Sequence, residues 1–301
     1  MGLRFYVVDA FSERPFGGNP AVIVPEADGM SDKAMAQVAA ELRMEAGFVL
    51  KPTFPDADVR IRFFSPGGEV DVSGHVTIAA YTALARAGKL PRGSRTVRQQ
   101  SRAGVLPVEL VDEEGPAGAG PWVTLDFGRP SFGTALDRTE VREALRCDDG
   151  ALVPGAPRIV TAGVALAVVA LTSPAVLNRV VPDMLKLVAL SRRRGVLGIA
   201  AFARPGLTPQ AALAARFFFP VVGPDEDVVS GAALAAIVAH AVRERQLACV
   251  REAEFLTDQG QALGRPNRAK VTVRTEAGHV SSVRVRGRGC LVAEGQLHGV
   301  E

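Results

Sequence analysis

Apolar and polar residues along this 301-residue chain follow two different spacings. Short apolar runs separated by turn residues predict strands, the first two at Phe5–Asp9 and Ala21–Val24. The next region repeats its apolar residues at helical spacing and predicts a helix over Ala34–Leu42, with Ser31 as its cap. Two further strands are expected at Gly47–Leu50 and Val59–Phe64.

Two later stretches, Val76–Ala87 and Ala232–Val242, are apolar on almost every side. A helix of this kind is stable only when its whole surface is buried, so we expect strands to enclose each of them. The other elements expected in the second half are a strand at Ile159–Leu171, a helix at Pro182–Ser191, and strands at Val196–Phe202, Lys270–Thr275, Val280–Val285 and Gly289–Ala293.

One order of features occurs twice along the chain. The first copy runs from Arg62-Phe63-Phe64 through Glu69 and Ser73-Gly74 into the first apolar helix, and the second from Arg216-Phe217-Phe218 through Glu226 and Ser230-Gly231 into the second. Two ordinary strand–loop–helix units are the alternative, but we favour a true duplication. It predicts two similar lobes, residues 1–128 and 129–301, with equivalent loops facing each other across a cleft; the last strand can return to the first lobe.

Composition narrows the class of protein. Hydrophobic residues make up 48% of the chain and charged residues 22%, which is typical of a globular protein with a substantial core. Basic and acidic residues are nearly balanced, 35 against 32, and the resulting net charge of +3 does not indicate a nucleic-acid partner. The one dense basic run, Arg192-Arg193-Arg194, is interpreted as a surface turn before a strand.

The cysteines and histidines do not form a cluster in the sequence. The three cysteines, Cys147, Cys249 and Cys290, lack metal-ligand or redox spacing, and the four histidines are scattered, so we expect no metal. The chain opens on a strand instead of a signal peptide, and its longest apolar stretch, Ile159–Leu171, is too short to cross a bilayer. We therefore expect a soluble cytoplasmic protein without a membrane partner.

Motifs along nearly the whole chain, from Phe5 to about Leu297, resemble those of the phenazine-biosynthesis (PhzF-like) isomerase family. Their number, order and spacing carry the resemblance more than any one of them. They are Asp9-Ala10-Phe11 with Arg14 to Ala21, Glu45 with Phe48-Val49, Gly74-His75 with Thr77, Glu226-Asp227 with Gly231, Gln259-Gly260 with Gly264-Arg265-Pro266, and Glu294-Gly295.

The resemblance implies an α+β fold related to diaminopimelate epimerase, in which each of two pseudo-symmetric lobes wraps a sheet around a buried central helix. It also implies a homodimer, no cofactor, and a small acidic metabolite as substrate. Asn19 lies within the opening motif and is expected to bind that substrate. The chain departs from the family pattern at Met44, Ala46 and Gly47, at Val76, and at Ala232, where the family has a serine that helps hold the substrate.

Moving a proton between carbons requires a group that takes the proton and returns it. Glu45 matches the catalytic glutamate of the family, and apolar or small residues flank it; without the resemblance it is interpreted as a surface glutamate at a helix end. His75, at the start of the first apolar helix, is expected to donate a hydrogen bond or move a proton, or simply to cap the helix. Asp227 is expected to orient the substrate or pair with His75; a turn aspartate is the alternative.

The remaining candidate residues belong to the two helix starts. Gly74 and Gly231 would let the substrate approach the backbone N–H groups there, although turn geometry also explains glycine. Ser230 is expected to cap the second helix or to contact the substrate. Neither turn contains a cysteine, which disfavours a racemase with paired cysteines.

The sequence therefore predicts a cofactor-independent isomerase that moves a proton within a small acidic metabolite, in biosynthesis of a secondary metabolite. One alternative is an epimerase of a small amino acid derivative, with Glu45 and Asp227 as opposed acids. Another is a family member that has lost catalysis and binds a metabolite or a partner protein.

Overall fold

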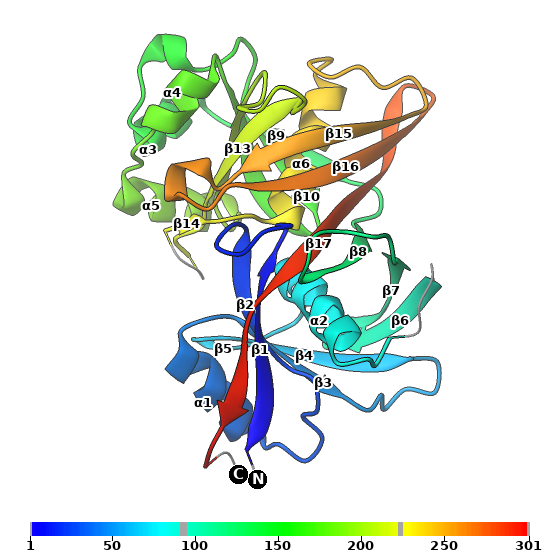
Figure 1. The fold of residues 1–301 in the computed structure, drawn as a ribbon. Coiled ribbons are helices and arrows are strands. Elements are labelled where there is room, and N and C mark those ends of the chain that lie inside the picture. Colours follow the sequence, from blue (N-terminus) through cyan, green and yellow to red (C-terminus); the bar gives the residue numbers. More distant parts are fainter. Residues whose placement is uncertain (1, 91–94, 222–224, 300–301) are drawn as a thin grey trace. The chain divides into compact units, whose positions relative to one another are not determined.

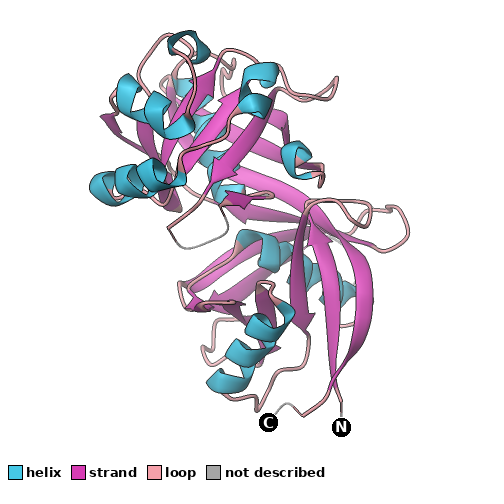
Figure 2. Cartoon of the chain, turned by 90° about the vertical axis from the view of Figure 1, so that its left-hand side faces the viewer, coloured by secondary structure: helices cyan, strands magenta, loops and turns pink. Residues whose placement is uncertain are grey.

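The computed structural model describes residues 2–90, 95–221 and 225–299. The chain forms two compact units. Unit 1 comprises Met1–Leu125 and Arg286–Glu301, and unit 2 comprises Asp126–Val285. Strands outnumber helices in both units (Figure 2).

Unit 1 is a set of strands around the helix α2 (Gly74–Arg86), which packs against β1, β2 and β3 (Figure 1). Every residue of α2 from Val76 to Leu84 is buried, as its apolar sequence predicts. The other elements are β1 (Leu3–Ala10), β2 (Asn19–Val24), α1 (Asp32–Leu42), β3 (Ala46–Leu50), β4 (Val59–Ser65), β5 (Gly68–Val70), β6 (Arg95–Ser101), β7 (Gly104–Val111) and β8 (Ala119–Asp126, whose last residue belongs to unit 2).

Unit 2 surrounds the helix α6 (Gly231–Arg243) in the same manner, and α6 packs against β10, β11, β12 and β16. A second core of unit 2 lies between the sheet and the helices α3, α4 and α5. The elements are β9 (Ser131–Ala135), α3 (Arg138–Leu145), the 3₁₀ turn Asp149–Ala151, β10 (Arg158–Ala162), β11 (Val164–Leu171), α4 (Pro174–Arg179), α5 (Met184–Arg194), β12 (Ile199–Ala203), β13 (Leu213–Phe218), β14 (Glu226–Asp227), β15 (Glu252–Gln259), the 3₁₀ turn Gln261–Leu263, β16 (Asn267–Glu276) and the start of β17 (His279–Leu297).

The strand pairings of unit 1 recur in unit 2. In unit 1, β2 is parallel to β3, β3 is antiparallel to β4, β4 forms a hairpin with β5, and β4 is parallel to β6. In unit 2, β11, β12, β13, β14 and β15 make the same series of pairings in the same order. The duplication therefore extends from the sequence to the topology.

A bidentate Arg–Glu pair closes the equivalent hairpin in each unit. Arg62 donates to both carboxylate oxygens of Glu69 at 2.7 and 2.9 Å, and Arg216 donates to both of Glu226 at 2.8 and 2.6 Å. Each guanidinium also lies over the ring of the phenylalanine two residues further on. This shared contact explains why the Arg-Phe-Phe tripeptide and the glutamate occur in both copies of the repeat.

Several expected elements differ from the structure. Ile159–Leu171 is not one strand but a hairpin, β10 and β11, which turns at Gly163 with φ 79°. Arg192–Arg194 is not a turn but the last turn of α5, where Arg193 and Arg194 pair with Glu140. The strands expected at 280–285 and 289–293 are one continuous strand, β17.

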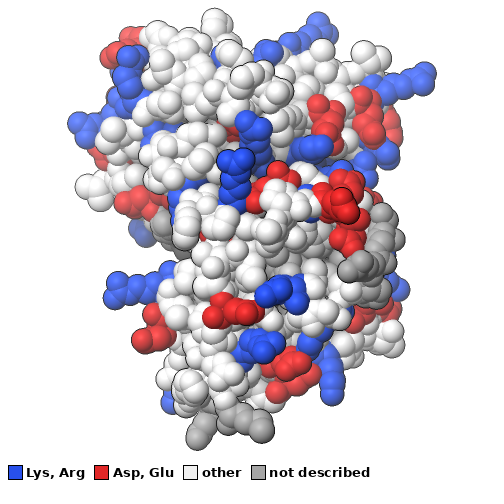
Figure 3. Space-filling view, in the orientation of Figure 1, with Lys and Arg blue, Asp and Glu red and all other residues white. Residues whose placement is uncertain are grey.

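The charged side chains and the lengths of the helices bear on two classes of partner, nucleic acids and membranes. Lysine and arginine side chains are intermingled with aspartate and glutamate over the face drawn in Figure 3, so that face lacks the broad basic area typical of nucleic-acid binding. No helix of the described residues is long and apolar enough to cross a membrane.

Candidate active site

The backbone fixes Glu45 at the point where β3 begins. The helix α1 ends at Leu42, and its C-cap residue, Arg43, adopts the left-handed conformation with φ 50°. The carbonyl of Glu45 then accepts a hydrogen bond from the N–H of Val22 at 2.9 Å, which continues the parallel pairing of β2 and β3. The Glu45 side chain remains 31% exposed, so it is not enclosed by the protein.

Three side chains meet at the start of α2. The Ser73 hydroxyl donates to Oε2 of Glu45 at 2.8 Å, and its Oγ lies 3.3 Å from Nδ1 of His75. Nε2 of His75 lies 3.7 Å from the same Oε2. The structure therefore brings together Glu45 and His75, which the sequence predicts, with Ser73, which it does not single out as a site residue.

Close packing fixes the positions of β3 and the start of α2, which carry these residues. Gly47, two residues after Glu45, lies directly against α2, because a Cβ there would be 2.8 Å from Cγ1 of Val76. A Cβ on Gly74, the first residue of α2, would lie 3.1 Å from Cδ1 of Leu125. The N-terminal end of α2, where the helix dipole is positive, is thus fixed beside the Glu45 carboxylate.

The other predicted site residues occupy defined places in their own units. Asn19 begins β2 opposite Ala10 and is 8% exposed. Asp227 ends β14 and is half-buried, and its carbonyl accepts from the amide of Gln259 at 3.1 Å. Ser230 caps α6, since its Oγ accepts from the N–H of Ala233 at 3.2 Å. Gly231 is the buried first residue of α6.

The two units differ at the positions that carry the chemistry. The hydrogen bond from Val22 to Glu45 is matched in unit 2 by one from Ala167 to the carbonyl of Gly198 at 3.0 Å. Glu45 therefore corresponds to a glycine. His75, the second residue of α2, corresponds to Ala232, the second residue of α6. The carboxylate of Glu45 and the imidazole of His75 therefore occur only in the first copy of the repeat.

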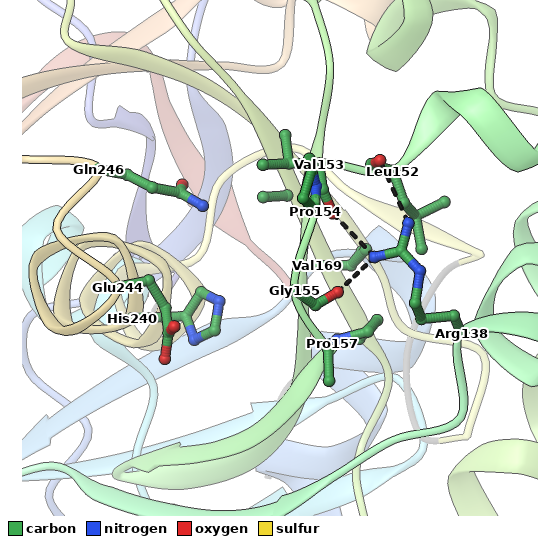
Figure 4. A pocket seen from close by; sticks show the side chains of 12 residues that line it. Arg138, Leu152, Val153, Pro154, Gly155, Pro157, Val169, His240, Glu244 and Gln246 are labelled. Carbon is green, nitrogen blue, oxygen red and sulfur yellow. Dashed lines mark hydrogen bonds between the residues drawn. The ribbon is translucent and has the colours of Figure 1, made fainter.

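A separate cavity lies in unit 2 at the C-terminal part of α6 (Figure 4). It has a volume of about 70 Å³, enough for a few water molecules, and is lined by His240, Glu244 and Gln246. Opposite them, the Arg138 guanidinium donates to the carbonyls of Leu152, Val153 and Gly155.

A larger cavity, of about 580 Å³, lies in unit 1. Tyr81 and Leu84, from the C-terminal half of α2, are among the residues that line it. None of Glu45, Ser73 and His75 lines this cavity or the one in unit 2. Within the described residues, no three His, Cys, Asp or Glu side chains converge to hold a metal ion.

The whole chain is similar to proteins of one family. The sequence profile described as phenazine biosynthesis-like protein matches residues 8–295. The uncharacterized isomerase YddE of Salmonella typhimurium is 34% identical over 96% of both chains. The trans-2,3-dihydro-3-hydroxyanthranilate isomerase of Pseudomonas aeruginosa is 30% identical over 98% of this chain and 99% of that protein.

Solved structures agree on the fold. A phenazine biosynthesis protein of the PhzF family from Bacillus anthracis has a TM-score of 0.87 at 24% identity, over 99% of both chains. A probable proline racemase from Agrobacterium radiobacter has a TM-score of 0.62 at 17% identity, over 98% of this chain and 93% of that one. The predicted α+β, epimerase-like fold is confirmed.

The chain is thus an α+β protein of epimerase-like fold, and the named relatives given above are isomerases. The chain belongs to the phenazine biosynthesis-like (PhzF) family. The prediction of an isomerase is confirmed at the level of this family.

Proposed function

We propose that this chain is a cofactor-independent isomerase that moves a proton within a small acidic metabolite, with Glu45 as the general acid/base. The observation that carries the proposal is the placement of Glu45: its carboxylate accepts a hydrogen bond from the Ser73 hydroxyl at 2.8 Å beside His75, and its side chain still remains 31% exposed. A base must reach the substrate and yet be held in one orientation, and this placement supplies both.

The difference between the units supports a single base. A two-base epimerase takes a proton from one face of a carbon and delivers another from the opposite face. In unit 2, the positions equivalent to Glu45 and His75 hold Gly198 and Ala232, neither of which can carry a proton on its side chain. One carboxylate that takes a proton from one carbon and returns it to another carbon on the same face is sufficient for an isomerase.

The other residues complete the proposal. The start of α2 at Gly74 and that of α6 at Gly231 would present N–H groups to acidic groups of the substrate. Asp227, whose counterpart in the first repeat is Val70, would orient the substrate with Ser230 and Asn19. The homodimer and the absence of a cofactor remain part of the proposal on the family resemblance alone.

The test is proton exchange with solvent. The protein is incubated in deuterated water with a panel of small cyclic and unsaturated acids, including trans-2,3-dihydro-3-hydroxyanthranilate, the compound named for the Pseudomonas relative. We expect isomerisation of one acid, with deuterium at the carbon that gains the proton in those turnovers in which the Glu45 carboxyl exchanges with solvent before it returns the proton. Glu45→Gln keeps the shape of the side chain but removes the base, so turnover should fall roughly 10²-fold or more while binding persists.

The outcomes separate the alternatives. Unchanged turnover in Glu45→Gln would remove Glu45 from the mechanism. Inversion at a stereocentre, lost equally in Glu45→Gln and Asp227→Asn, would point to the epimerase with two opposed acids. Binding of an acid without isomerisation or exchange would point to the non-catalytic family member.

A further inference from the structure

The N-cap residue of α2 is an exception among the α-helices of the described residues. At the other five helix starts, the side chain of the N-cap residue accepts a hydrogen bond from a backbone N–H of the first turn, as capping requires. Ser73, at the start of α2, makes no such bond. The residues that do cap are Ser31, Asp137, Ser173, Asp183 and Ser230.

The Ser73 hydroxyl makes a different contact, with a residue 28 positions away. It donates to Oε2 of Glu45 at 2.8 Å and faces Nδ1 of His75 at 3.3 Å. Ser73 is only 9% exposed, so its hydroxyl is held by these partners more than by solvent. In the second copy of the repeat, where the glutamate and the histidine are replaced, Ser230 caps its helix. The serine leaves its capping role only where the candidate acid/base is present.

We infer that Ser73 is a positioning residue for proton transfer, an inference that rests on the proposed function of Glu45. The single O–H of Ser73 donates to Oε2 of Glu45. The other carboxylate oxygen, Oε1, is therefore the one that takes and returns the substrate proton. Because that O–H is committed, Oγ can only accept from the imidazole. In the neutral imidazole this assigns the proton of His75 to Nδ1 and leaves Nε2, 3.7 Å from Oε2 of Glu45, without one.

The first readout is kinetic and uses the exchange reaction of the full chain. We expect Ser73→Ala to lower kcat about tenfold with KM within about twofold, because the carboxylate is still present but no longer held in one orientation. Ser73→Thr keeps the hydroxyl and should restore kcat to within about threefold of the wild type. Ser31→Ala is the matched control, since it removes a serine that caps a helix in the same unit and should leave kcat unchanged.

The second readout does not depend on activity. The ¹⁵N chemical shifts of the histidine ring nitrogens report which nitrogen carries the proton, and a His75→Gln spectrum assigns the signals of His75. We expect the Nδ1–H form in the wild type and in Ser73→Thr. In Ser73→Ala we expect a mixture of the two neutral forms.

The inference is overturned if Ser73→Ala keeps both the wild-type kcat and the wild-type ¹⁵N pattern. It is also overturned if Ser31→Ala lowers kcat as much as Ser73→Ala, because the effect would then come from a general loss of order in unit 1 and not from the contact between Ser73 and Glu45. If Glu45→Gln retains full turnover, the proposed function fails. The Nδ1–H assignment is then still decided by the spectra alone.

Discussion

At the scale of single residues, Gly47 sets the distance between β3 and α2. An added Cβ would lie 2.8 Å from Cγ1 of Val76 and 3.0 Å from Cδ1 of Ile23, both closer than normal contact. We expect Gly47→Ala to lower the free energy of unfolding by about 1–3 kcal/mol, because β3 or α2 must shift to make room. Denaturant midpoints of the purified variant would measure this loss.

The matched control is Gly67→Ala in the same unit. A Cβ at Gly67 has only the Ser65 hydroxyl near it, at 3.7 Å, and the residue is exposed. Its stability should stay within about 0.5 kcal/mol of the wild type. Equal stability of both variants would show that β3 and α2 are not packed as tightly as the distances indicate.

Whether the role of a residue can be predicted from the sequence depends on whether its contacts are close in the sequence. Glu45 and His75 stand in sequence motifs, so the resemblance selects both before any coordinates are known. Ser73 also stands in the repeat, but a serine before an apolar helix predicts a cap and nothing more. Its actual contact joins residues 28 positions apart, and no local pattern encodes that.

At the scale of elements, an unbroken apolar run hides the boundary between two strands. β10 and β11 are both rich in apolar residues, so the run from 159 to 171 gives no alternation that would separate them, and only Gly163 marks the turn. The two central helices, in contrast, can be predicted from their apolar sequences, because a helix that is apolar on every side must be buried on every side. The helix α3 was missed although Asp137 caps it and Val141, Ala144 and Leu145 are spaced for one buried face.

The helix α6 carries a titratable group that destabilises the fold in acid. His240 is 3% exposed, and burial lowers its pKa to about 4 from an ordinary value near 6.5. The unfolded chain therefore takes up a proton below pH 6.5 that the folded chain accepts only near pH 4. Stability from this group is complete above pH 6.5 and is lost as the pH falls from 6.5 to 4, by up to ~3 kcal/mol.

The measurement is the free energy of unfolding as a function of pH for His240→Leu and the wild type. The wild type should lose more stability than His240→Leu between pH 6.5 and pH 4. His279→Gln is the control, because His279 is exposed, and it should follow the wild type. Parallel curves for all three proteins would mean that burial does not lower the pKa of His240 in the folded chain.

At the scale of the whole molecule, unit 1 is not continuous in sequence. β1 pairs with β2 on one side and with the C-terminal part of β17 on the other, in a register that places Leu3 opposite Leu297. Arg288, from the same segment and only 4% exposed, donates to the carbonyls of Glu113 and Gly120. Residues 286–297 therefore belong to unit 1 and supply the second partner of β1, and residues 287–290 are buried in it.

This arrangement predicts which fragments fold. Residues 2–125 alone should remain unfolded, because β1 lacks one partner and the backbone carbonyls that bind Arg288 lack their donor. Since Leu3 and Leu297 are opposed in an antiparallel pair, a two-residue Asn-Gly turn can join residue 297 to residue 3. The permuted fragment, residues 286–297 followed by that turn and residues 3–125, should give a dispersed NMR spectrum and a cooperative thermal transition.

The control is the same fusion with the order of residues 286–297 shuffled, which keeps length and composition but removes the register with β1 and the position of Arg288. It should behave as residues 2–125 do alone, because a strand that cannot place its buried side chains inward does not pair stably. Cooperative unfolding of residues 2–125 without the segment, at the temperature of the permuted fragment, would contradict the prediction. It would mean that β17 covers unit 1 without being needed to form it.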